Sequence, residues 1–95
     1  MNIQDIEIKI KKYDKEKNFV IANLIISGAL ELRGFVIRYT TTKKSPNSAI
    51  WLVNPPSVVG RNKQYFWIAR FLDTELWGRL ESKMIDEAKN YSNSL

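Results

Sequence analysis

The chain has 95 residues and a formal net charge of +5, and it contains neither cysteine nor histidine. This length predicts one small domain over residues 1–95. The missing residue types exclude disulfides, thiolate nucleophiles, imidazole bases and most zinc sites. The glycines stand singly, so there is no glycine-rich phosphate loop. We therefore expect a protein that is not an enzyme and that has no cofactor, metal or small-molecule substrate.

The first third of the chain predicts two strands. Ile6, Ile8 and Ile10 alternate with charged residues, which indicates a strand with one solvated face. A charged turn over residues 11–18 follows. Residues 19–26, FVIANLII, are nearly all apolar, so they predict a central strand covered on both faces.

The same region gives no sign of a targeting or membrane segment. Charges are mixed into the first apolar residues, unlike a signal peptide. The longest uncharged run covers residues 18–30, which is shorter than the roughly 20 residues that a membrane-spanning helix needs. We expect a soluble cytoplasmic protein with no membrane contact.

Residues 30–40, LELRGFVIRYT, predict a third strand whose alternation changes phase at Gly34. Before this glycine two leucines alternate with charged residues, and after it apolar residues take the places that the charged ones held. A β-bulge would produce this change, and so would a glycine in a strand that is buried on both faces. If the phase does change, Arg33 and Arg38 lie on one side of the strand although they are five residues apart.

The rest of the chain predicts two further strands and a helix, joined by a polar loop over 40–48 and a turn over 58–64. From Asp73 or Thr74 onward, apolar residues recur at spacings of three and four, which predicts a helix over about 74–90. The expected fold is α+β: an antiparallel sheet of about five strands, then one C-terminal helix packed on it, in a homodimer. The predicted strands cover about residues 3–10, 19–26, 30–40, 49–53 and 65–72.

Charge is unevenly distributed along the chain. Residues 33–70 carry seven bases and no acid, whereas residues 71–95 carry five acids and three bases. Basic groups neutralise phosphates, and aromatic faces stack on unpaired bases for roughly 1–3 kcal/mol each. This combination on a sheet is typical of proteins that bind DNA or RNA single strands. The candidate nucleic-acid-binding residues are Arg33, Arg38, Lys43, Lys44, Arg61, Lys63, Arg70, Trp51, Tyr65 and Trp67.

A second interpretation of these residues stays open. Aromatic residues in strands commonly pack in a core, and Trp51, Tyr65 and Trp67 are stacking candidates only where their faces are open. An exposed aromatic patch or an unpaired strand edge would also suit a protein-interaction adaptor that binds no nucleic acid.

Several segments in order resemble the stage V sporulation protein G (SpoVG, septation protein) family. They read "IEIKI", "FVIANLII", "LELRGFVIRY", "AIWLVNPPS", "VGRNKQYFWIARFLD" and "TELWGRLESKMIDEA". The resemblance implies a small dimeric bacterial regulator that binds DNA and RNA, with links to septation, cell division and sporulation. It also implies binding through Arg61 and Lys63, and through Arg70 and Arg79. Two valines, Val58 and Val59, stand where the family often has Lys or Arg. The segment "LDTELWGRLESKM" also resembles the helix of the single-stranded-DNA-binding transcription coactivators.

Overall fold

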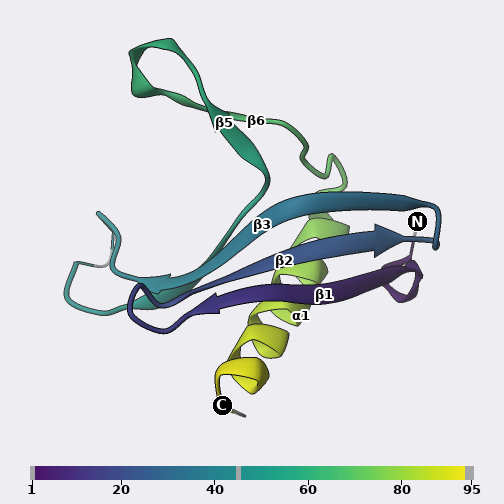
Figure 1. Cartoon of the computed structure of the whole chain (residues 1–95), viewed down its shortest axis with the longest axis horizontal. Coiled ribbons are helices and arrows are strands. Elements are labelled where there is room, and N and C mark those ends of the chain that lie inside the picture. The colour runs from purple at the N-terminus through teal and green to yellow at the C-terminus, as the bar shows by residue number, and fades with distance from the viewer. Residues whose placement is uncertain (1, 45, 94–95) are drawn as a thin grey trace.

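A four-stranded antiparallel sheet with one long helix across one face forms the body of the protein (Figure 1). The computed structural model describes residues 2–44 and 46–93, apart from the side chains of Tyr65 and Trp67. The strands of the sheet lie in chain order, β1-β2-β3-β4. The elements are η1 (Ile3–Asp5), β1 (Ile6–Asp14), β2 (Phe19–Ile26), β3 (Leu30–Thr40), β4 (Ile50–Asn54), β5 (Ser57–Val59), η2 (Arg61–Lys63), β6 (Tyr65–Trp67) and α1 (Thr74–Asn93).

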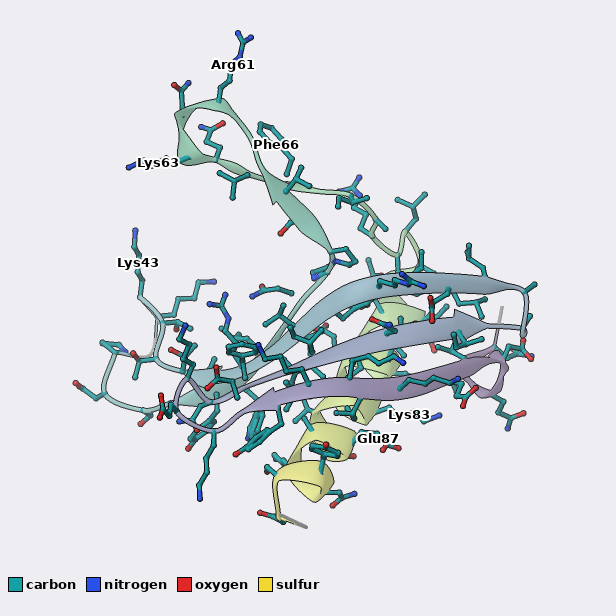
Figure 2. All side chains as sticks on the ribbon, in the orientation of Figure 1. Lys43, Arg61, Lys63, Phe66, Lys83 and Glu87 are labelled. Carbon is teal, nitrogen blue, oxygen red and sulfur yellow. The ribbon has the colours of Figure 1, made fainter. Side chains whose placement is uncertain are left out.

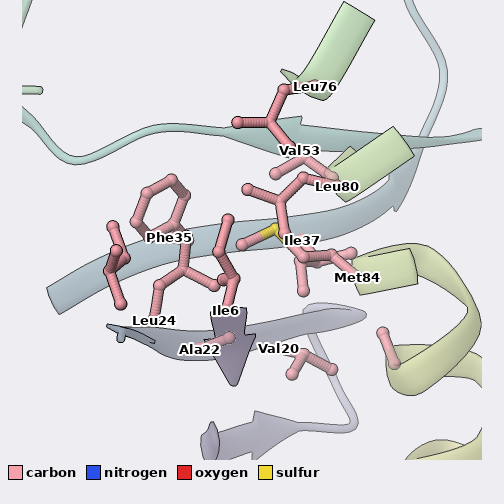
Figure 3. Close-up of a cluster of buried hydrophobic side chains, with 12 residues drawn as sticks. Ile6, Val20, Ala22, Leu24, Phe35, Ile37, Val53, Leu76, Leu80 and Met84 are labelled. Carbon is pink, nitrogen blue, oxygen red and sulfur yellow. The ribbon is translucent and has the colours of Figure 1, made fainter. Parts of the chain in front are cut away.

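The core lies between the sheet and α1, as the sequence predicts (Figure 3). Every second residue of β2 is buried there, from Val20 to Ile26. The helix contributes a stripe at four-residue spacing, Leu76, Leu80, Met84 and Ala88, because this spacing keeps side chains on one helical face. Burying each large aliphatic side chain contributes about 1.5–3 kcal/mol. This layer accounts for the α+β fold of so short a chain.

The helix begins where the sequence predicts and continues three residues beyond the expected end. Asp73 caps it, since the Leu76 amide donates to Asp73 Oδ1 at 3.0 Å and the Trp77 amide donates to the Asp73 carbonyl at 2.9 Å. Of the two predicted caps, Asp73 therefore serves. No helix within residues 2–44 and 46–93 is both long and apolar enough to cross a membrane.

The phase change at Gly34 is a β-bulge. The register of β2 with β3 shifts between Ala22 and Leu24, so that Asn23 faces the extra residue. Gly34 has φ +94°, a conformation that side chains rarely adopt, and its amide donates to Asn23 Oδ1 at 3.2 Å. Because of the bulge, the apolar residues on both sides of Gly34 face α1. The charged residues on both sides of it face the opposite way.

The predicted strand over 65–72 is wrong in length and in place. Only Tyr65–Trp67 form a strand, which pairs with β5 in a separate two-stranded sheet. Val58 and Val59 of β5 belong to the segment predicted as a turn. Pro55 and Pro56 follow β4 directly and lack amide donors, so the chain leaves the main sheet there. The main sheet therefore has four strands, and the fifth predicted strand lies in the separate hairpin, within the α+β fold that the sequence predicts.

Residues 57–68, here called the arm, project from the body as this second hairpin (Figure 1). The Ile68 amide closes the base by donating to the Pro56 carbonyl at 2.7 Å, and the Gly60 amide donates to the Gln64 carbonyl near the tip. After the arm, Phe71 stacks on Trp77 with ring centroids 5.6 Å apart. This contact fixes the chain to α1 again.

Two smaller differences concern the first strand and β4. The strand predicted over 3–10 begins as the short helix η1, and β1 continues to Asp14 through a second register shift between Ile10 and Lys12. β4 lies one residue later than predicted. β2 and β3 have the predicted bounds.

Candidate nucleic-acid interface

The face of the sheet opposite α1, here called the open face, carries Arg33 and Arg38 together. Arg38 lies opposite Phe19 of β2 and Leu52 of β4 in the register. Arg33 precedes the bulge on the same face as Glu31. The bulge therefore brings together two arginines that an unbroken strand would place on opposite faces.

Two lysines of β1 add to this face. Lys9 lies opposite Asn23, and Lys12 lies opposite Ile21, both on the side away from α1. Lys9, Lys12, Arg33 and Arg38 are all exposed, and we refer to them as the basic set. Half-buried apolar side chains of β2 and β3, such as Ile21 and Val36, lie between these cations.

One member of the basic set is paired with an acid. Arg33 Nε donates to Glu31 Oε1 at 2.5 Å, with the Arg33 side chain 79% exposed. This hydrogen bond from Arg33 is the largest cause of the lowered pKa of the Glu31 carboxyl. Desolvation, the next largest effect, opposes it, and the charges of Arg33, Lys11 and Lys9 each lower the pKa further. An exposed pair of this kind adds little to stability. Within the described residues Arg38 has no ion-pair partner.

The loop cations lie at the tips of two separate projections. Lys43 and Lys44 are exposed in the loop between β3 and β4. Arg61 and Lys63 are exposed at the tip of the arm, in η2, where Asn62 and Lys63 have φ values of 65° and 59°. In Figure 2 the Lys43 side chain extends toward the arm, on the side of the view where Lys63 lies. The Arg61 side chain lies at the far end of the arm and points away from the body. These cations belong to a loop and to the arm, whereas the basic set lies on strands of the main sheet.

The remaining basic candidates lie near α1. Arg70 is exposed in the segment between the arm and the helix, and it lines two apolar grooves. Arg79, which the family resemblance implies, lies on the helix, where its Nη2 is 3.1 Å from Glu75 Oε1. Neither belongs to the open face.

The aromatic candidates do not join the open face either, so far as they are described. Trp51 lies on the α1 side of β4, where its ring centroid is 5.2 Å from that of Tyr39, and it packs against the core. The side chains of Tyr65 and Trp67 lie outside the described residues. The aromatic side chain that does lie on the open face is Phe19, directly opposite Arg38.

Sequence reasoning missed Phe19, Lys9 and Lys12 as site residues. The signal was present for the lysines, because the alternation of residues 6–10 already places Lys9 on the solvated face. For Phe19 the sequence gives no such signal by itself. Its place beside Arg38 follows only when the bulge at Gly34 is known, because the bulge decides which face Arg38 lies on and the register puts Phe19 opposite it. Cross-strand register, rather than local pattern, decides which residues share this face.

The described residues contain no group of three acidic, histidine or cysteine residues that could hold a metal ion. Comparisons with models of protein families, with curated proteins and with solved structures found no match. The site is therefore interpreted from its own chemistry.

Proposed function

We propose that the protein is a small, dimeric, cytoplasmic regulator that binds DNA or RNA single strands across the open face. The observation that carries this proposal is the bulge at Gly34, which gathers Arg33 and Arg38 beside Lys9 and Lys12 on a face that α1 leaves uncovered. The same face also carries the acids Glu7, Asp14 and Glu31, so its cations exceed its acids by one. Cations beside half-buried apolar side chains suit a flexible strand, whose phosphates and bases need charge and apolar contact at the same time.

Each part of the open face has a separate role in this proposal. The basic set contacts phosphates and so contributes affinity for any sequence, since backbone contacts carry no sequence information. Phe19 offers the ring on which a base stacks, beside Arg38. Lys43 and Lys44 act as an outer electrostatic guide, because they are exposed in a loop at the end of β3.

Membership of the SpoVG family is part of the proposal and gives it a biological setting, regulation linked to septation or sporulation. Its support is the order of the resembling segments in the sequence. The arm follows the proline pair, and the family resemblance assigns Arg61 and Lys63 to nucleic-acid contact there. Binding through the arm tip would be additional to binding on the open face.

The direct test is titration of labelled single-stranded DNA and RNA with the protein at low salt. We expect saturable binding that weakens steeply as salt is added, because released counterions supply much of the free energy. Absence of any binding at about 50 mM salt would refute the proposal.

A protein-interaction adaptor is the second candidate, and the exposed apolar side chains of the arm favour it. A pull-down distinguishes the two functions. One recovered protein that survives nuclease and about 0.5 M salt would support the adaptor, since salt screens backbone contacts strongly.

A further inference from the structure

The arm presents large apolar side chains to solvent. Val58, Val59, Phe66 and Ile68 are between 53% and 66% exposed, and the Phe66 ring lies at the arm in Figure 2, away from the core. The ring is held against the arm itself, since a Cβ added at Gly60 would lie 2.4 Å from Phe66 Cε2. Exposed apolar groups of this number on one projection are typical of an interaction surface.

The arm also has little to stabilise it within one chain. Its two strands have three residues each, and within residues 2–44 and 46–93 they pair only with one another. An isolated two-stranded hairpin is marginally stable in water, so packing against another surface is needed to hold it. That surface is not the body of the same chain, from which the arm projects (Figure 1).

A complementary surface lies at the root of the arm. A groove of about 450 Å³ runs between the start of β3 and the start of α1, and we call it the root groove. The groove is lined mainly by apolar side chains, among them Leu30, Leu32, Phe71 and Leu72, and also by Arg70 and Asp73. Leu30 is 53% exposed and Leu72 is 81% exposed, so the groove presents apolar surface that its own chain does not cover.

We propose that the arm of one copy docks in the root groove of a second copy of this chain, and that the second arm docks reciprocally. This inference rests on the dimer in the proposed function and names its interface. A two-fold interface requires a self-complementary surface. The arm and the root groove meet at residues 68–72, so one axis beside this segment brings each arm to the other copy's groove.

The exposed apolar area is of the size that a stable dimer needs. Six side chains are involved, four on the arm and two in the groove. If each offers roughly 100 Å², they supply about 600 Å² per copy, most of the roughly 800 Å² per partner of a standard interface. Backbone and polar contacts along the arm supply the remainder. A smaller partner, such as a peptide, would leave one of the two surfaces uncovered.

Sedimentation without nucleic acid tests the interface. We expect the parent to sediment as a dimer of about 22 kDa, twice the 11.1 kDa of one chain. The variant Phe66→Ser/Ile68→Thr should raise the dimer dissociation constant at least about 30-fold, as loss of central apolar anchors does. The matched control, Ile50→Thr/Tyr91→Ser, changes an exposed isoleucine and an exposed aromatic residue elsewhere, so it should leave the dimer intact. A circular dichroism spectrum like that of the parent and a cooperative thermal transition would show that both variants fold, although loss of the dimer itself lowers the apparent melting temperature.

Disulfide cross-linking tests the geometry, because the parent has no cysteine. The double variant Leu30→Cys/Val58→Cys should form a covalent dimer on mild oxidation, whereas each single variant should not. A disulfide within one chain would instead leave a monomer, which a denaturing gel distinguishes.

Three results would overturn the inference: a monomeric parent at about 100 µM, a dimer unaffected by Phe66→Ser/Ile68→Thr, or a dimer whose double-cysteine variant does not cross-link between chains. Each leaves oligonucleotide binding to be judged by its own titration. Failure of that titration, with the cross-link formed, would remove the nucleic-acid proposal and leave the arm-exchanged dimer standing.

Discussion

Replacing Arg33 and Arg38 together by glutamine removes half of the basic set and leaves the fold intact, because both side chains are exposed on the open face. On single strands each neutralised phosphate adds about 0.7 to the salt slope of binding, so two lost contacts lower the slope by about 1.4. If the contribution of these two phosphate contacts to the binding free energy vanishes near 1 M salt, the double variant binds about 15-fold more weakly than the parent at 0.15 M salt and about 65-fold more weakly at 0.05 M.

Fluorescence anisotropy of a labelled oligonucleotide of about 20 nucleotides, titrated at several salt concentrations, measures both quantities. The matched control is Lys83→Gln/Lys89→Gln, which also removes two exposed positive charges, but on α1 and away from the open face. It should reduce the salt slope by no more than the general loss of two charges. Equal losses in the control and in the open-face variant, or an unchanged slope in the latter, would refute the role of the open face.

The remaining predictions concern the fold and its charges. Gly34→Ala should destabilise the protein by about 1–2 kcal/mol, because alanine is strained at a φ of +94°. Gly78→Ala should instead stabilise it by about 0.5–1 kcal/mol, because Gly78 lies in the helix and nothing is within 4 Å of the added Cβ. Paired thermal melts of the two variants measure both changes. Leu80→Ala, at a fully buried position, should cost about 2–5 kcal/mol in urea unfolding, and a cost under 1 kcal/mol would contradict the core described. The pKa of Glu31 is lowered in the folded state, so its stabilising effect is present above the unfolded pKa and is lost as the pH falls through the folded one. A carboxyl NMR titration should show this pKa rising toward its ordinary value in Arg33→Gln, and an unchanged titration would show that the ion pair is not its cause. Burial raises the pKa of Glu81 and so favours the neutral form of its carboxyl in the folded state. The variant Glu81→Gln should therefore gain stability relative to the parent as the pH rises above the unfolded pKa. Urea unfolding midpoints at pH 3 and pH 7 measure this gain, and an equal gain at both pH values would exclude burial of the charge as its cause.

Local pattern predicts the sheet and the helix well. The alternation in residues 6–10 and the three-and-four spacing after Asp73 each predict which side chains are buried, and the structure confirms both. The apolar run of β2 predicts a strand covered on both faces, which is wrong for one face: Phe19, Ile21 and Ile25 on the open face are only half-buried. The bulge was foreseen as one of two explanations of Gly34. Which of the two explanations is right depends on Asn23 of β2, whose side-chain oxygen accepts a hydrogen bond from the Gly34 amide of β3. No local pattern specifies that partner.

The arm was not predicted, because the side-chain pattern of residues 65–72 is that of a strand, and such a pattern does not specify which strand it pairs with. The sequence contains the cause, Pro55 and Pro56, but proline marks only that the chain leaves β4 and not where it pairs next. The candidate site was predicted in part. Arg33 and Arg38 share a face as the phase argument requires, whereas Trp51 lies on the other side of the sheet, since core packing and base stacking favour the same residue types.

The central claim is that nucleic acid binds the open face, and the arginine side-chain Nε–Hε NMR signals test it most directly. On addition of a single-stranded oligonucleotide, the signals of Arg33 and Arg38 should shift in a saturable, salt-sensitive way, while that of Arg79 on α1 should stay in place. Saturable shifts confined to Arg79, or an absence of shifts at Arg33 and Arg38 while binding occurs, would contradict the account.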